Sequence, residues 1–114
     1  GTAHRCEVEV NFPGTTYPPT VNDARALKTA RAAARRVVQE KDLVVVLPTM
    51  GGEDFAFYAQ EVPSAFAALG IRNEAKGSTF CLHHPQFNVD EDALPVGAAM
   101  HVEFALGALE ELAK

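Results

Sequence analysis

The stretch that decides the predicted fold is Leu43-Val44-Val45-Val46-Leu47, followed by Pro48-Thr49-Met50-Gly51-Gly52. Its first five residues are apolar at every position, whereas a strand with one solvent-facing side alternates apolar and polar residues. A short run of this kind, ended by a proline and two glycines, is typical of a central strand covered by helices on both faces. We therefore expect 43–47 to lie inside a layered sheet.

The N-terminal segment 4–12 has a different pattern. Its apolar and polar residues alternate strictly, with Cys6, Val8, Val10 and Phe12 on one face. This period of two predicts an antiparallel or edge strand that is half buried. Two strands with such different burial are not expected in one sheet. A boundary is therefore predicted in the connector 15–20, which contains Pro18-Pro19.

Helical patterns separate and follow these strands. Asn22 or Asp23 can cap a helix that runs to about Gln39, with an apolar stripe of Leu27, Ala30, Ala34 and Val38. Shorter helical segments are predicted at 53–60 and 63–69, a strand at 77–82, and a last helix with Pro95 in its first turn that runs to about Ala113. Gly97 and Gly107 weaken that helix unless it packs closely on a sheet. The order of elements predicts an α/β fold, a layered sheet with flanking helices.

Composition excludes several classes of protein. The chain has 114 residues, 47% of them hydrophobic, and a net charge of −5. Disorder is excluded by the apolar content, and nucleic-acid binding is disfavoured by the negative charge. No uninterrupted apolar run exceeds that of 43–47, so no membrane span is expected. Cys6 and Cys81 form no closely spaced pair, which argues against a disulfide scaffold. The chain begins at Gly1 inside a strand-like pattern, which suggests that upstream sequence is missing, so localisation is left unknown, with a soluble cytoplasmic protein as the default expectation.

The loop 49–54 joins the expected central strand to a helix. Ligands often bind at such positions in α/β sheets, because free backbone N–H groups face the crevice. Nucleotide binding is disfavoured because no GxGxxG motif is present and Glu53 and Asp54 would repel phosphate. Two interpretations of Gly51 and Gly52 remain open: a functional loop, or a tight turn followed by capping carboxylates.

The segment Cys81-Leu82-His83-His84-Pro85 holds the most informative side chains. On a strand the two imidazoles point to opposite faces, so one of them at most is a good metal ligand. A lone histidine at a strand end is more often structural, since catalytic metal sites need about three protein ligands. Further donors could come from a set of carboxylates, but their spacing selects none of them: Glu53, Asp54, Asp90 and Glu91. His101, in the last helix, is expected to serve packing or the surface.

Three motifs carry a family resemblance. They are Tyr17-Pro18-Pro19-Thr20-Val21-Asn22-Asp23, then Met50-Gly51-Gly52-Glu53-Asp54-Phe55-Ala56-Phe57-Tyr58, then Leu82-His83-His84-Pro85-Gln86-Phe87-Asn88-Val89-Asp90-Glu91. In this order and spacing, the chain resembles the C-terminal third of amidohydrolases that cleave N-acyl amino acids. These include hippurate hydrolases and auxin–amino-acid-conjugate hydrolases, in the di-metal aminoacylase and carboxypeptidase G superfamily.

The resemblance implies a domain arrangement and a site. Residues 1–16 would end an inserted lid or dimerisation domain, and 17–114 would form the C-terminal part of the catalytic domain. His83 would be a metal ligand and His84 would not, while Gly51 and Gly52 would line the substrate pocket through their backbone. The complete enzyme would hold two divalent metal ions, zinc or manganese, and this chain would supply one ligand and no catalytic residue.

The implied reaction is attack of metal-activated water on the amide bond of an N-acyl amino acid, with a glutamate outside this chain moving the proton. The implied partners are this small-molecule substrate and a second subunit bound through the lid domain, with no nucleic acid or membrane. The 114-residue chain alone is expected to be inactive. The alternative is a non-catalytic α/β binding or assembly module derived from the same family.

Overall fold

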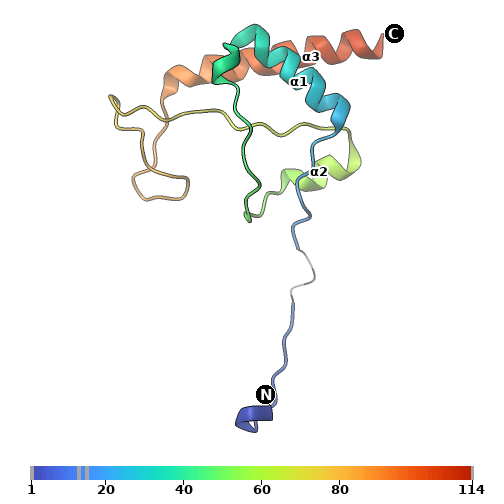
Figure 1. Cartoon of the computed structure of the whole chain (residues 1–114), viewed down its shortest axis with the longest axis vertical. Coiled ribbons are helices and arrows are strands. Elements are labelled where there is room, and N and C mark those ends of the chain that lie inside the picture. The colour runs from blue at the N-terminus through green and yellow to red at the C-terminus, as the bar shows by residue number, and fades with distance from the viewer. Residues whose placement is uncertain (1, 13, 15, 114) are drawn as a thin grey trace.

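The computed structural model describes residues 2–12, 14 and 16–113. It contains the α-helices α1 (Ala24–Val37), α2 (Phe55–Glu61) and α3 (Leu94–Leu112), and the short 3-10 helices η1 (Thr2–His4), η2 (Glu40–Asp42) and η3 (Glu91–Ala93). Extended segments and turns join them (Figure 1). The described residues form no regular strand, and their single β-bridge pairs Asn73 with Ser78.

Helix α1 begins where a side chain satisfies its free N–H groups. One carboxylate oxygen of Asp23 accepts hydrogen bonds from the N–H groups of Arg25 and Ala26, both at 2.9 Å. Such a cap supplies the partners that the first helical turn lacks. The predicted start is therefore confirmed with Asp23 rather than Asn22 as the cap, and the helix ends at Val37, two residues before the predicted Gln39.

The packed part of the molecule is the contact between α1 and α3, which cross in Figure 1. The buried residues of α1 are small: Ala26, Thr29, Ala33 and Ala34. Of the four-residue stripe expected from the sequence, Ala34 is buried and Leu27, Ala30 and Val38 are half-buried, so the stripe is confirmed in part. Small side chains let two helix backbones approach closely, which is why α1 turns its alanines toward α3.

The two glycines of α3 pack against side chains and not against a sheet. A Cβ atom added at Gly107 would lie 3.1 Å from Cγ2 of Thr29 in α1, and one added at Gly97 would lie 3.1 Å from Cδ2 of Leu69. Close approach is therefore the reason for both glycines, as predicted, but the partner is a neighbouring helix at Gly107 and a loop residue at Gly97.

The predicted layered sheet is not formed by the described residues. Residues 43–50 are extended and unpaired, and Val44 and Val45 are 78% and 79% exposed. Residues 6–12 are extended and exposed, and of 77–82 only Ser78 forms a bridge. A strand needs the N–H and C=O groups of a neighbour, and no second extended segment lies in register here. The sheet stays a prediction.

The short helix expected at 63–69 is wrong, because this segment is extended. The side-chain amide of Asn22 holds it in that form, since Oδ1 accepts the Phe66 N–H at 2.7 Å and Nδ2 donates to the Phe66 carbonyl at 3.3 Å. The carbonyl of Ser64 accepts the Asp23 N–H at 2.9 Å. These bonds use backbone groups that a helix would pair internally.

The described chain is more expanded than a packed domain. Its radius of gyration is 19.5 Å, whereas a compact domain of this length has about 13 Å. Residues 2–12 extend away from the rest (Figure 1), and the buried apolar residues are four alanines: Ala26, Ala33, Ala34 and Ala56. Among the described residues, no helix has the length and apolarity needed to cross a membrane.

Candidate functional site

Gly52 lies against the ring of Tyr17, the first residue of the first sequence motif. A Cβ atom at position 52 would sit 2.9 Å from Cδ2 of that ring, closer than carbon atoms approach without a shift. The Tyr17 ring in turn contacts Phe57 of α2, with ring centroids 5.9 Å apart. A side chain at position 52 would therefore force the Tyr17 ring to move. Gly51 is different, since its Cβ would meet nothing nearer than Oγ1 of Thr49 at 3.9 Å.

The start of α2 shows which of two carboxylates caps the helix. Oε1 of Glu53 accepts the N–H of Phe55 at 3.1 Å, whereas the Asp54 side chain makes no capping bond. The interpretation of the loop as a turn with capping carboxylates therefore holds for Glu53 and fails for Asp54. Gly51 and Gly52 are both exposed, so their backbone remains accessible to a ligand.

Aromatic rings fix α2 beside this loop. Phe55 contacts Phe66 with centroids 5.3 Å apart and Tyr58 with centroids 6.2 Å apart. Together with the contact of Tyr17 and Phe57, these rings join the residue-17 segment, the glycine loop and the 63–69 segment. Sequence reasoning assigned no role to Tyr17, although its place in the first motif was a usable signal.

His83 lies in a tight turn and not at the end of a strand as predicted. The carbonyl of Cys81 accepts the N–H of His84 at 3.1 Å, which closes a turn over residues 81–84, named here the His83 turn. His83 has a φ of 68°, in the left-handed region that residues other than glycine rarely adopt. Its side chain is exposed and forms no hydrogen bond with another described residue. Strained backbone of this kind is enriched at functional positions.

His84 is held by its neighbours. Its Nδ1 accepts the N–H of Gln86 at 3.1 Å, and its ring stacks on Phe80 with centroids 4.3 Å apart and planes 12° apart. Its carbonyl accepts the N–H of Phe87 at 2.9 Å. The two adjacent histidines therefore differ in kind: His84 is engaged, and the imidazole of His83 is open to solvent.

The residues present fit a metal ion only as a partial site. An exposed imidazole is a good donor to zinc, and His83 offers one. Within residues 2–12, 14 and 16–113, however, no group of three or more His, Cys, Asp or Glu side chains could hold a metal ion. The candidate carboxylate Asp90 is instead paired with Lys76. This part of the chain can supply a ligand but not a complete coordination shell.

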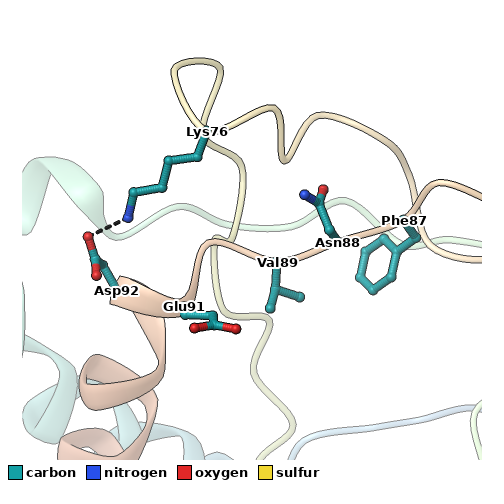
Figure 2. A pocket seen from close by; sticks show the side chains of 6 residues that line it. All are labelled: Lys76, Phe87, Asn88, Val89, Glu91 and Asp92. Carbon is teal, nitrogen blue, oxygen red and sulfur yellow. Dashed lines mark hydrogen bonds and ion pairs between the residues drawn. The ribbon is translucent and has the colours of Figure 1, made fainter.

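An ion-pair network not anticipated from the sequence joins residues on both sides of the His83 turn, and Figure 2 shows its pair of Lys76 and Asp92. Nζ of Lys76 donates to Oδ1 of Asp90 at 2.5 Å and also to Asp92, and Nδ2 of Asn73 donates to Oδ2 of Asp90 at 2.7 Å. The hydrogen bond from Lys76, then that from Asn73, lowers the pKa of Asp90 below its ordinary value. The bonds to Asp90 and then Asp92 raise the pKa of Lys76. The network fastens the turn 73–78 to η3.

An open pocket of about 570 Å³ borders this network. Figure 2 shows its lining residues, most of which belong to the third sequence motif: Lys76, Phe87, Asn88, Val89, Glu91 and Asp92. The cation of Lys76 is already engaged by two carboxylates. The lining therefore offers no unpaired positive charge to an anionic ligand.

Comparison with known proteins identifies the class to which the chain belongs. Residues 4–107 match the model of Peptidase family M20/M25/M40, so the chain is a member of this family. Family membership implies an α/β peptidase-type domain, and it confirms the resemblance to amidohydrolases and metallopeptidases that the three motifs indicated.

The chain is similar to several individual members of this family. The chain is 40% identical over 103 residues to IAA-amino acid hydrolase ILR1-like 6 of Arabidopsis thaliana, covering 88% of this chain and 22% of that protein. It is 35% identical over 113 residues to ILR1-like 2 of the same plant, covering 96% and 26%. Thermostable carboxypeptidase 1 of Saccharolobus solfataricus is 35% identical over 98 residues, covering 86% and 24%. The chain thus spans about a quarter of each relative. No solved structure matches it.

Proposed function

We propose that the chain is the C-terminal part of the catalytic unit of a metal-dependent amidohydrolase that cleaves N-acyl amino acid conjugates, including auxin-type conjugates. The observation that carries this proposal is the exposed imidazole of His83, held at a positive φ within the third motif. The relatives named as IAA-amino acid hydrolases and carboxypeptidases support the same class of reaction.

The proposed division of the chain places 1–16 in a lid or dimerisation domain and 17–114 in the catalytic domain. The contrast between the alternating segment 4–12 and the apolar run 43–47 supports it. So does the position of residues 2–12, which extend away from the helices in Figure 1. In the complete enzyme, 43–47 would then be a central strand whose partners cover both of its apolar faces.

In this proposal His83 donates one nitrogen to a divalent cation, zinc or manganese, and residues outside this chain supply the other donors. When bound, such a metal pair supplies Lewis-acid activation of the reacting groups. Gly51 and Gly52 contribute backbone to the wall of the substrate pocket, and the contact of Gly52 with Tyr17 keeps that wall in place. The 114-residue chain supplies no general base and is expected to be inactive alone.

The small-molecule substrate is the partner that the relatives' names suggest, and a second subunit bound through the lid domain completes the proposal. The exposed apolar side chains of 43–47 are expected to pack against another part of the protein, since burying apolar surface stabilises a protein by about 25 cal/mol per Å². The remainder of a complete enzyme would provide that part.

The test compares two adjacent histidines in the complete enzyme. We expect His83→Ala to remove most activity and to weaken the binding of one metal ion, because that ion loses one of its protein ligands. The matched change His84→Ala should be mild when metal is in excess. Metal content after dialysis and kcat at saturating metal measure both effects. Equal losses in the two variants would contradict the assignment of His83.

The second candidate is a non-catalytic binding or assembly module of the same family. It is favoured by the lack of any three-residue metal cluster in the described part of the chain. The mass of the native protein separates the two candidates. A product of several times 12.2 kDa supports the enzyme, and a stable native product of 12.2 kDa supports the module.

A further inference from the structure

We propose that His84 is a positioning residue that holds the His83 turn in the conformation that presents the imidazole of His83. The structural half of this inference stands on the contacts of His84 alone. Its functional half rests on the proposed role of His83 as a metal ligand.

The contacts of the His84 side chain reach both sides of the turn. Its ring stacks on Phe80, before the turn, and its Nδ1 accepts the N–H of Gln86, after the turn. His83 lies between these two anchor points, and its φ of 68° is unfavourable for a residue with a side chain. A conformation of this kind persists only where the surroundings impose it. The His84 side chain is the group that supplies such contacts on both sides.

The hydrogen bond of Nδ1 also fixes the chemistry of the His84 ring. Because Nδ1 accepts a hydrogen bond from the N–H of Gln86, its lone pair is not available to a metal ion, and the proton of the neutral ring is on Nε2. This arrangement matches an Asx-turn, in which a side-chain oxygen accepts the N–H two residues later. The oxygen of an asparagine at position 84 lies the same number of bonds from the backbone as Nδ1.

This correspondence gives a rescue variant. His84→Asn keeps the acceptor and loses most of the stacking, His84→Ala loses both, and Phe80→Leu removes the stacking partner alone. In the 114-residue chain, NMR backbone couplings and chemical shifts of residue 83 report the sign of its φ. We expect a positive φ in the parent chain and in His84→Asn, and a loss of the left-handed population in His84→Ala, with Phe80→Leu between them.

Folding is monitored in the same spectra. The amide signals of α1 and α3 should be unchanged in all variants, because the turn is exposed and lies outside the helix pair. A negative φ at residue 83 in the parent chain, or an unchanged positive φ in His84→Ala, would overturn the inference. Asparagine failing to restore the turn would also overturn the part played by the Nδ1 acceptor.

A titration with Zn²⁺ tests the functional half separately. Binding to a single imidazole is weak, and it is followed through the ring signals of residue 83, with His83→Asn as the control for other histidines. We expect similar affinity in the parent chain and His84→Asn, and about tenfold weaker affinity in His84→Ala, as is typical when a group that orients a ligand is removed. If the φ results hold and Zn²⁺ leaves His83 unaffected in the parent chain, the metal assignment fails while the structural role of His84 stands.

Discussion

The helix pair α1 and α3 and the extended segment 43–50 show opposite relations between sequence and structure. In the helix pair the buried residues are small and belong to α1, whereas the segment 43–50 contains the most apolar run of the chain and is largely exposed. The difference lies in where the backbone finds its partners. A helix pairs its N–H and C=O groups within itself, and a strand needs those of a neighbour. Hydrophobicity alone therefore does not bury a segment that has no adjacent strand.

The strongest test of this comparison places a charge in each region. Ala33, in the α1–α3 contact, is 2% exposed, and Val45 is 79% exposed. We expect Ala33→Asp to lower the free energy of unfolding by more than about 3 kcal/mol, because it buries an unpaired carboxylate. Val45→Asp should change it by less than about 0.5 kcal/mol. Thermal unfolding followed by circular dichroism measures both.

A control in the same helix separates burial from helix propensity. Ala32 is exposed, so Ala32→Asp should cost less than about 1 kcal/mol. A large loss in Val45→Asp would show that 43–50 is packed in solution, and the comparison between the two regions would then fail.

A smaller effect is expected from the helix caps, which test how much the hydrogen bonds at the start of a helix stabilise it. Asp23→Ala should destabilise α1 by about 1 kcal/mol, since it removes both hydrogen bonds to the first turn. Asp54→Ala is the matched change at α2, where the side chain makes no capping bond, and it should be nearly neutral. Similar losses in the two variants would show that the contribution of Asp23 is not its cap. Thermal unfolding again provides the measurement.

The smallest effect concerns the network that fastens the turn 73–78. The pKa of Asp90 is held below 3.8, so its contribution to stability is present above that pH and is lost as the pH falls through the lowered pKa. The pKa of Lys76 is raised above 10.5, so its contribution is complete below that pH and is lost as the pH rises through the raised pKa. The aliphatic proton shifts of Ser78 should therefore be constant between these limits.

The variant Asp90→Asn isolates the acidic limit of this profile. It should weaken the transition at low pH, and it should bring the alkaline transition of Lys76 closer to its ordinary value, since Asp92 remains as the single carboxylate partner. A transition of Ser78 in the neutral range of the parent chain would contradict this account.

Helix α1 could be predicted from sequence because its signals are local. Asp23 is two and three residues from the N–H groups that it caps, and the end at Val37 follows within two residues of the expected position. The extended form of 63–69 could not be predicted in this way. It depends on the amide of Asn22, which is 44 residues from Phe66 in the chain. The local pattern of residues 63–69 does not indicate a hydrogen bond to so distant a residue.

The candidate site divides in the same manner. The motifs selected His83, Gly51 and Gly52, and the family resemblance implied that His83 and not His84 is a metal ligand, which stays a prediction. The structure shows that the two side chains differ in their contacts. The physical form of this difference was not expected, because the prediction assumed a strand where the structure has a turn with Nδ1 of His84 bonded to Gln86. The network of Lys76 and Asp90 was missed because its charges are 14 residues apart and become neighbours only through the turn 73–78.

The contact of Gly107 with Thr29 has a consequence for how the sequence can change over time. A Cβ atom added at position 107 would lie 3.1 Å from Cγ2 of Thr29, so a larger residue at either position requires the other side chain to shift or to become smaller. We expect the two positions to covary among homologues, an alanine at 107 being accompanied by serine, alanine or glycine at 29. The summed side-chain volume of two residues that lie 78 positions apart would then stay nearly constant during evolution.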